Sequence, residues 1–279
     1  MTEYLTTAQQ QRLTELSAPD SEITMAFETK QARDAFFKEK EKFHAEGNRG
    51  RILDTLNNTR YTMLHSVEDT LSRCLMSDGF TKVSTPTIIT ANMLARMTVD
   101  PTHPLTNQVF WLDNKRCLRP MLAPNLYEVM GQLRKITREP VRIFECGSCF
   151  RKESQSSKHL NEFTMLNLVE LAGVEEGKQM EKLKQMATSL MAVLEIADYE
   201  LVVESSVVYG ETLDIIVGGQ ELASGAYGPH PLDDNWQISD PWVGIGFGLE
   251  RVVMAKSGLG HIKSVGRSTG YLNGARLKI

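Results

Sequence analysis

Residues Phe144–Val169 read FECGSCFRKESQSSKHLNEFTMLNLV and decide the fold of this chain. Each arm alternates apolar with polar residues, and the turn formers Ser154–Lys158 lie between the arms, which predicts an antiparallel hairpin. Side chains two positions apart lie on the same face of a strand. The spacing therefore places Arg151 beside Glu153, a guanidinium next to a carboxylate.

The return arm carries one amide on an otherwise apolar face. That face holds Phe163, Met165, Asn167 and Val169. An amide buried without a hydrogen-bond partner costs on the order of 1–3 kcal/mol. We therefore expect either the core or a bound ligand to supply a partner for Asn167.

Length and composition are those of an ordinary globular chain. The 279 residues suffice for one large domain and a small extension, with a core that needs no disulfide or metal. No apolar run approaches the roughly 18 residues of a spanning helix, and the N-terminal stretch MTEYLTTAQQQRL is polar. These features predict a cytoplasmic protein without a membrane segment. The net charge of -4 disfavours nonspecific coating of duplex DNA, yet it allows a local basic face for a structured RNA.

The spacing of Cys146 and Cys149 raises the possibility of a redox or zinc site. A redox pair would begin a helix, whereas this pair lies inside a predicted strand, and no second pair or histidine cluster stands at zinc spacing. We therefore interpret these cysteines as two small buried thiols.

Residues 1–55 are predicted to form a helical N-terminal extension, followed by a main domain at residues 56–279. Apolar residues recur at helical spacing among lysines between Phe27 and Phe43, which fits either a solvated amphipathic helix or a contact with nucleic acid. The run Gly47–Arg51 breaks this pattern, so it is a candidate hinge into the main domain.

A helix is predicted at Arg60–Ser77, followed by a strand at Phe80–Ile88. Proline inside a strand belongs at an edge or a bulge, so Pro86 suggests an edge strand. An edge that is neither covered nor charged invites a partner subunit, and a homodimer is therefore expected. Farther along, the pattern predicts a helix near Pro124, a second at Glu175–Ile196, and then strands at Glu200–Val207, Thr212–Val217 and Gln220–Tyr227.

Three glycines alternate along Trp242–Gly248, which reads WVGIGFG. Glycine at every second position removes all side chains from one face of a strand, so a flat ligand can lie against the backbone. The dinucleotide fingerprint differs, because its glycines lie in a turn before a helix. The residues after the strand, Glu250 and Arg251, deliver an arginine to the edge of this bare face.

These stretches resemble the class II aminoacyl-tRNA synthetases. Gly79–Pro86 is similar to motif 1 of that family, Phe150–Glu153 to motif 2, and the glycine strand with Arg251 to motif 3, in the family's order. The resemblance implies an α+β fold, in which an antiparallel sheet is flanked by helices. It also implies an enzyme that activates an amino acid with ATP and transfers it to the terminal 3′-hydroxyl of a tRNA.

Longer matches resemble the pyrrolysyl-tRNA synthetase family within this class. They are RPMLAPNLY, CFRKES, HLNEFTMLN, VYGETLD, PWVGIGFGLER and YLNGA. The chain is similar to the short form of that family, which lacks a separate N-terminal tRNA-binding domain. The implied reaction is ATP-dependent ligation of pyrrolysine, an Nε-acylated lysine, to tRNA(Pyl), an amber suppressor, through an aminoacyl-adenylate. The tRNA contacts would then come from the main domain, from the helices of residues 1–55 and from the basic C-terminal end.

The resemblance also implies roles for individual residues. Arg151 and Arg251 would be catalytic, and Mg²⁺ would be held by Glu221 and Ser224. The ATP-binding residues would be Arg151, Glu153, His159, Leu160, Phe163, Glu221, Ser224, Gly248 and Arg251.

The amino-acid pocket implied by the resemblance is a deep apolar sleeve, and in the family the amide corresponding to Asn167 binds the side-chain carbonyl of pyrrolysine. Its residues would be Leu122, Leu126, Tyr127, Met130, Asn167, Val169, Tyr209, Ala226, Trp242 and Gly244. Such a pocket would admit pyrrolysine or Nε-acyl-lysine analogues and reject lysine, whose ammonium group would lie unpaired among apolar groups.

Two alternatives remain open at this point. The first is a phenylalanyl-type synthetase, although a plain aromatic substrate would leave the amide of Asn167 without a hydrogen-bond partner. The second is an inactive paralogue that binds tRNA or ATP. An inactive paralogue is expected to have lost catalytic and ATP-binding residues. Arg151, Glu153, Glu221 and Arg251 are all present. Ala226 and Val169 depart from residues common in the family's longer members, so the width of the pocket stays open.

Overall fold

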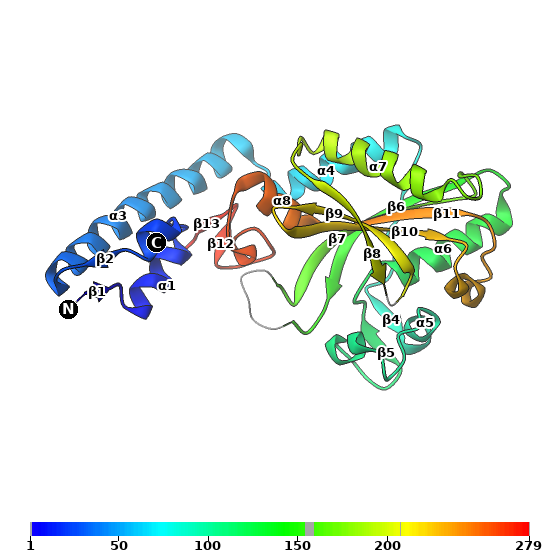
Figure 1. Ribbon diagram of the computed structural model, residues 1–279, viewed down its shortest axis with the longest axis horizontal. Helices are drawn as coiled ribbons and strands as arrows, with labels where there is room; N and C mark the ends of the chain where they lie inside the picture. The colour runs from blue at the N-terminus through cyan, green and yellow to red at the C-terminus, as the bar shows by residue number, and fades with distance from the viewer. Residues whose placement is uncertain (1, 154–158, 207, 279) are drawn as a thin grey trace.

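A seven-stranded sheet forms the larger part of the molecule (Figure 1). The computed structural model describes residues 2–153, 159–206 and 208–278. Neighbouring strands are antiparallel except for the first pair, which is parallel. The strand order is β3 (Thr81–Lys82), β6 (Val141–Phe150), β7 (Glu162–Leu171), β11 (Trp242–Gly248), β10 (Gln220–Gly228), β9 (Gly210–Val217) and β8 (Glu200–Ser206).

The predicted hairpin is confirmed as β6 and β7, which pair antiparallel over their full length. Its predicted turn, residues 154–158, lies outside the described residues. Along β7 the side chains alternate: Leu166 and Leu168 enter one hydrophobic core, whereas Phe163 and Val169 belong to another on the opposite face. The period of two therefore separates a fully packed face of the sheet from a face that is available for a site.

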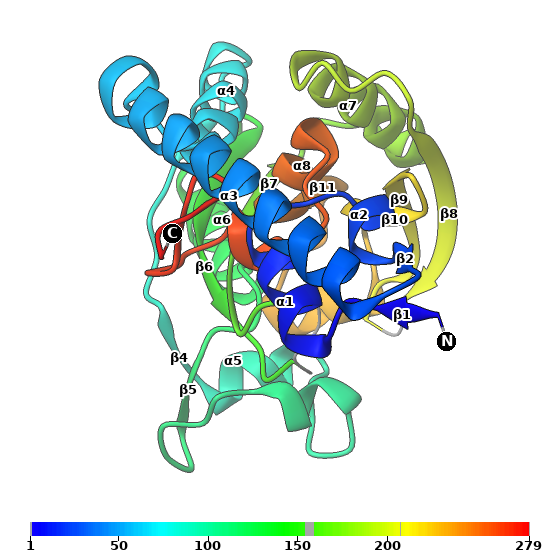
Figure 2. The same cartoon turned by 90° about the vertical axis from the view of Figure 1, so that its left-hand side faces the viewer.

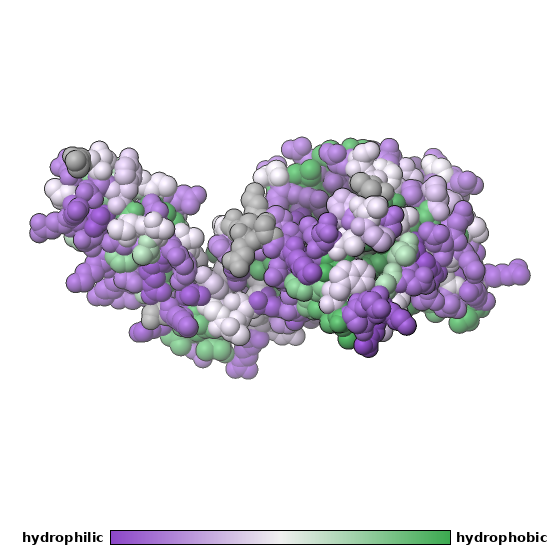
Figure 3. All heavy atoms as spheres, turned by 90° about the horizontal axis from the view of Figure 1, so that it is seen from below, coloured by the Kyte–Doolittle hydropathy of each residue, from purple (hydrophilic) through white to green (hydrophobic). Residues whose placement is uncertain are grey.

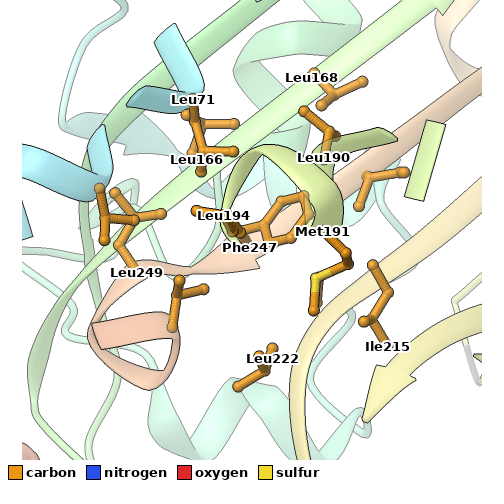
Figure 4. Close-up of a cluster of buried hydrophobic side chains, with 14 of the residues drawn as sticks. Leu71, Leu166, Leu168, Leu190, Met191, Leu194, Ile215, Leu222, Phe247 and Leu249 are labelled. Carbon is orange, nitrogen blue, oxygen red and sulfur yellow. The ribbon is translucent and has the colours of Figure 1, made fainter. Parts of the chain in front are cut away.

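Three helices cover the packed face: α4 (Met63–Ser77), α7 (Gln179–Val193) and α8 (Leu249–Ser257). Figure 4 shows their side chains meeting those of the sheet, with Phe247 among the leucines. Full burial of such a side chain contributes about 1.5–3 kcal/mol. The predicted helices at Arg60–Ser77 and Glu175–Ile196 are thus confirmed, each with a shorter span.

One helix, α6 (Ala123–Ile136), packs on the opposite face against β6 and β7. Proline occupies its first turn, as expected for Pro124, because a residue there donates no intrahelical hydrogen bond. Since α6 covers only part of this face, the remainder borders a cavity.

The predicted strand Phe80–Ile88 is wrong. Only Thr81–Lys82 pairs with β6, and a separate strand β4 (Ile88–Thr90) pairs with β5 (Arg116–Leu118) next to helix α5 (Ala91–Arg96) and the short helix η2 (Pro104–Gln108). The backbone N–H of Thr85 donates to the side-chain carboxylate of Glu145 in β6 (3.1 Å) rather than to a backbone carbonyl of that strand. Pro86 has no N–H to donate, so the ladder stops between the two segments.

The N-terminal part contains β1 (Glu3–Tyr4), α1 (Thr7–Glu15), α2 (Asp20–Ile23), β2 (Ala26–Phe27) and the long helix α3 (Lys30–Asp54). The predicted hinge at Gly47–Arg51 is wrong, because α3 continues through it. Buried Asn48 holds the helix there: its amide nitrogen donates to the Leu16 carbonyl (2.9 Å) and its amide oxygen accepts from the Arg276 N–H (2.6 Å). The chain leaves helical geometry at Arg60, after the π-helical turn η1 (Thr55–Thr59).

The C-terminal segment returns to this N-terminal part. After the turn η4 (Ile262–Ser264), the hairpin of β12 (Tyr271–Leu272) and β13 (Ala275–Arg276) packs against α3 (Figures 1 and 2). The Arg12 guanidinium also donates to the Lys278 carbonyl (3.0 Å). Among the described residues, no helix combines the length and the apolar character needed to cross a membrane.

Candidate active site

A cavity of about 460 Å³ lies on the open face of the sheet, beside α6. In Figure 3, hydrophobic residues group within the larger part of the molecule, whereas the smaller part at the left is mostly hydrophilic. The floor of the cavity consists of β7, β11 and β10, the three strands at the centre of the sheet. The site therefore lies on strands that are each paired with a neighbour on both sides.

Strand register aligns the polar residues of the floor in one row. Asn167 on β7 is opposite Gly246 on β11, which is opposite Ser224 on β10, which is opposite Asp214 on β9. All four line the cavity. Residues directly opposite one another in a sheet point to the same side, so this row faces the ligand space as a unit.

The glycines of β11 make the floor flat, as the sequence predicted. A Cβ at Gly244 would lie 2.9 Å from the carbonyl oxygen of Leu168, and a Cβ at Gly246 would lie 3.0 Å from both polar atoms of the Asn167 amide. These separations are shorter than van der Waals contact. Glycine is therefore needed at these two positions for the backbone of β11 to approach its neighbour.

Asn167 has an unmet hydrogen-bonding requirement. Its Oδ1 is buried and has no partner among the described residues. Because orphaned buried polar atoms are rare in native structures, this amide indicates a ligand with a polar group at that depth. The structure thus places the predicted odd amide at the wall of a cavity.

Arg151 forms the polar end of the same cavity, immediately after β6 ends at Phe150. Its Nε donates to the carbonyl of Pro120 (2.9 Å), and its guanidinium lies 5.3 Å from the centre of the Phe163 ring. Burial lowers the pKa of Arg151, yet a guanidinium remains charged at neutral pH. The result is a fixed positive charge in a partly desolvated wall.

Glu153 also borders the cavity, although it lies beyond the strand on which the sequence placed it. The backbone N–H of Arg151 donates to the Asn161 carbonyl (3.0 Å), and that of Glu153 donates to the Asn161 side chain (3.1 Å). These bonds extend the hairpin contact past the formal strand end. His159, Leu160 and Phe163 line the same region.

Across the cavity, Arg251 is held near Glu221. Its Nη1 donates to the Glu221 carbonyl (3.0 Å) and lies 3.7 Å from the Glu221 carboxylate. The Ser224 hydroxyl donates to the Asp214 carboxylate (2.6 Å). Carboxylate and hydroxyl oxygens here fit Mg²⁺, which takes one or two protein carboxylates together with water and substrate phosphates.

Glu250 is a buried carboxylate at the cavity that the sequence analysis did not assign. The backbone N–H of Thr164 donates to both of its oxygens, each at 2.9 Å. Burial raises the pKa of Glu250, and these hydrogen bonds oppose the rise. Glu250 thereby ties the first turn of α8 to β7, which fixes the backbone beside Arg251.

Aromatic rings form the apolar end. Tyr127 of α6 meets Trp242 of β11 edge-on, with ring centres 5.6 Å apart, and Tyr209 lies 6.2 Å from Trp242. Trp236 stacks behind Tyr127 at 5.3 Å. The sleeve is therefore walled by rings from three separate segments.

A buried ion pair supports the Arg151 wall from behind. Arg119 donates to Glu145 at 2.8 Å, with only 3% and 2% of the two residues exposed. The Arg119 carbonyl accepts from the N–H of Phe150 (2.9 Å), and the next carbonyl, that of Pro120, holds Arg151. Sequence reasoning missed this pair, because its members are 26 positions apart.

Nearly all sequence-predicted site residues line this one cavity. Leu122 is the exception: it is fully buried at the start of α6 and lies outside the described cavity lining. Lining residues that the sequence did not indicate include Met121, Ala123, Glu204, Ser206, Val208 and Asp214. Met165 and Gly246, which strand alternation placed on the faces of Asn167 and of the alternating glycines, also line the cavity.

The prediction of two buried thiols is confirmed for Cys149 only, because Cys146 is half-buried. Cys149 is buried in β6, and burial raises its thiol pKa to about 12, so the thiol stays protonated at neutral pH. The structure describes all four cysteines as free. Within the described ranges, no cluster of three or more histidine, cysteine or acidic side chains is placed to hold a metal ion.

Comparisons with known proteins agree with this geometry. Residues 52–207 match the family model of the tRNA synthetases class II core domain (F). The crystal structure of pyrrolysyl-tRNA synthetase from Desulfitobacterium hafniense superposes with a TM-score of 0.94 at 47% identity, over 99% of this chain and 99% of that chain. A structure of Desulfitobacterium hafniense PylSc, a pyrrolysyl tRNA synthetase, superposes with a TM-score of 0.92 at 46% identity, over 99% of this chain and 96% of that one.

Proposed function

Because the chain belongs to the class II aminoacyl-tRNA synthetases, within the pyrrolysyl-tRNA synthetase family, we propose that it ligates pyrrolysine or a similar Nε-acyl-lysine to tRNA(Pyl). The cavity would bind both reactants of the first step. Its charged end suits ATP, and its aromatic end suits a long side chain with a bulky acyl group. The carrying observation is the place of the Asn167 amide, which lines the cavity between these ends with a donor and an acceptor, and whose Oδ1 has no partner among the described residues.

At the charged end, Arg151 and Arg251 would hold the phosphates from opposite sides. Glu153 would accept a hydrogen bond from the adenine amino group, and Phe163 would stack on the base, as its place beside Arg151 allows. Glu221 and Ser224, with Asp214 behind the serine hydroxyl, would hold Mg²⁺. When bound, that ion supplies positive charge to the phosphate oxygens.

The first step forms an aminoacyl-adenylate. The substrate carboxylate oxygen attacks the α-phosphorus of ATP, a new P–O bond forms, and pyrophosphate leaves from the opposite side. No nucleophilic side chain is required, because alignment and fixed positive charge lower the barrier. In the second step, the terminal 3′-hydroxyl of the tRNA attacks the activated carbonyl and AMP leaves. The buried guanidinium of Arg151 provides charge that needs little reorganisation.

At the apolar end, Asn167 would bind the carbonyl of the acyl-lysine amide through its Nδ2, and Oδ1 could accept from a ligand donor or bound water. Plain lysine would bring an ammonium group into a sleeve of aromatic and aliphatic side chains, where it would lie unpaired. Phenylalanine would leave the amide of Asn167 without a partner, which disfavours the phenylalanyl alternative. The residues whose loss would mark an inactive paralogue are all in the cavity.

ATP–pyrophosphate exchange tests this proposal. The protein is assayed with pyrrolysine, an Nε-acylated lysine, phenylalanine and lysine in parallel. We expect exchange with the first two only. Exchange with phenylalanine alone would overturn the proposed substrate but keep the class of reaction, and exchange with none of the four would favour a regulatory paralogue.

Asn167→Ala is expected to relax selectivity. The variant loses the amide that distinguishes an acyl-lysine from a lysine derivative without a side-chain carbonyl. Because a buried polar group left unsatisfied costs about 1–3 kcal/mol, kcat/KM for pyrrolysine should fall roughly fivefold to a hundredfold. Exchange rates with matched substrates that have or lack the carbonyl measure the effect. An unchanged ratio between these substrates would refute the role of Asn167.

Gly246→Ala is expected to raise the KM for the amino acid by about tenfold. The added methyl group would meet the Asn167 amide at 3.0 Å and displace it, and overpacking of this kind costs typically 1–3 kcal/mol. Gly131→Ala in α6 is the matched control, because its Cβ would find its nearest neighbour at an ordinary 3.7 Å. Equal kinetics for the two variants would contradict the close approach at β11.

Several finer assignments belong to the same proposal. The protein would act as a homodimer through the region of β3 and β4, and its tRNA would contact residues 1–55 and the basic side chains near Lys263 and Arg267.

We retain 1–55 and 56–279 as the proposed domain division. A cytoplasmic location follows from the need for ATP and tRNA at the site of translation.

A further inference from the structure

Asp233 lies in the short helix η3 (Pro231–Trp236), which belongs to the connection between β10 and β11. Only 1% of the residue is exposed. Its Oδ1 accepts from the Tyr127 hydroxyl (2.8 Å), and its Oδ2 accepts from the Trp242 indole N–H (2.8 Å) and from the His230 backbone N–H (2.7 Å). One buried carboxylate therefore accepts three hydrogen bonds.

Two of these donors belong to walls of the cavity. Tyr127 is presented by α6 and Trp242 by β11, and both line the ligand space. Their rings also contact each other edge-on. Asp233 itself lies outside the described cavity lining, so it acts on a ligand only through these rings.

The third donor, the backbone N–H of His230, connects Asp233 to Tyr209, the remaining ring of the apolar end. The ring of His230 lies 6.5 Å from that of Tyr209, which in turn lies 6.2 Å from Trp242. Asp233 therefore fixes the backbone of the residue against which Tyr209 packs. The rings of Tyr127, Trp242 and Tyr209 at the apolar end are therefore all connected to this carboxylate, either directly or through one neighbour.

Burying a carboxylate costs free energy, so packing alone would not explain an aspartate at this buried position. Burial raises the pKa of Asp233, while its three donors favour the charged form. A hydrogen-bonded network of this kind specifies one arrangement of its members more narrowly than apolar contacts do. The rings of Tyr127 and Trp242 have two rotatable bonds each, and the shared acceptor holds both in register.

Given the proposed use of the cavity for an acyl-lysine, we infer that Asp233 is a positioning residue that sets amino-acid specificity. Its carboxylate holds the Tyr127 and Trp242 rings at the separation that a large acyl group requires. Without it, two buried donors would lose their acceptor, and the rings would turn toward other partners. The sleeve would then change in width while the ATP end, whose residues make none of these three hydrogen bonds, keeps its geometry.

The test compares Asp233→Leu and Asp233→Asn in ATP–pyrophosphate exchange with pyrrolysine and with Nε-acetyl-lysine. For Asp233→Leu we expect the KM for pyrrolysine to rise at least tenfold, the KM for ATP to change less than twofold, and the preference for pyrrolysine over Nε-acetyl-lysine to fall. Asp233→Asn keeps an oxygen for Trp242 and His230 and a donor for the Tyr127 hydroxyl. It should therefore stay within about threefold of the unmodified protein.

Asp240→Ala is the matched control, because Asp240 lies on the same connection and bonds Arg134 at the surface. Its kinetic constants should not change. If Asp233→Leu does not fold, Tyr127→Phe removes one of the three hydrogen bonds and keeps the ring, and the pyrrolysine KM should again rise without a change in the ATP KM.

Two outcomes would overturn the inference and leave the proposed function standing. One is an unchanged KM for pyrrolysine in these variants, and the other is an equal rise in the KM values for ATP and pyrrolysine. The second would show a merely structural role for Asp233. If the unmodified protein exchanges with neither acyl-lysine, the proposed function fails first, and the specificity role fails with it. The unmodified protein is therefore measured before any variant.

Discussion

Arg151→Ala is expected to reduce adenylate formation by about 10²–10³-fold, the loss typical when one preorganised charge or donor is removed from an active site. The guanidinium is fixed by the Pro120 carbonyl and lies over the Phe163 ring, so it needs little reorganisation as negative charge develops. Single-turnover formation of the adenylate measures the effect directly. Arg151→Lys should recover only part of the rate, because an ammonium group lacks the planar donor pair.

Two controls separate this catalytic effect from a loss of structure. Arg138→Ala removes an exposed arginine between α6 and β6 and should leave the rate unchanged. Thermal unfolding of Arg151→Ala should remain close to that of the unmodified protein. Retention of the full adenylation rate in Arg151→Ala would refute the assigned role.

Glu145→Ala is expected to destabilise the protein by about 3–5 kcal/mol, because it leaves the Arg119 guanidinium buried and uncompensated. The removed carboxylate also accepts from the Thr85 N–H (3.1 Å) and from the Thr85 hydroxyl (2.6 Å). For a chain of this size we expect the Tm to fall by roughly 6–20 °C. Urea denaturation gives the change in the free energy of unfolding.

The matched control for this prediction is Glu128→Ala, which breaks the partly exposed ion pair with Arg96. Exposed pairs contribute less than about 1 kcal/mol, so this variant should unfold almost like the unmodified protein. The double variant Arg119→Met with Glu145→Leu should regain much of the lost stability, because it leaves no unpaired charge. Equal stability of Glu145→Ala and Glu128→Ala would contradict the buried network.

The parts of the fold that the sequence predicted are those controlled by local patterns. Alternation along 144–169 predicted β6, β7 and the face that carries Asn167, and the glycines of β11 predicted a bare floor. Each of these features depends on residues a few positions apart. The motifs then placed Arg151 and Arg251 in one site, which the structure brings together from β6 and α8.

The missed features depend on contacts between distant parts of the chain. Tyr127 and Asp233 are 106 positions apart, and nothing near Asp233 distinguishes it from a turn aspartate. The predicted hinge at Gly47–Arg51 failed because the buried bonds of Asn48 outweigh the low helix propensity of glycine. The resemblance placed Leu122 in the sleeve, but Leu122 lies in the core beside the cavity, and helical spacing cannot tell a cavity wall from such a core position.

The bond between Asn48 and Arg276 has a consequence for the order in which the protein folds during synthesis. The two residues are 228 positions apart. At about 5–20 residues per second, Arg276 is added roughly 11–46 s after Asn48. Helix α3 can form early, but the buried amide oxygen of Asn48 must wait for its backbone partner until Arg276 has left the ribosome. The packing of α3 is therefore completed only after the strands of the large sheet have been synthesised.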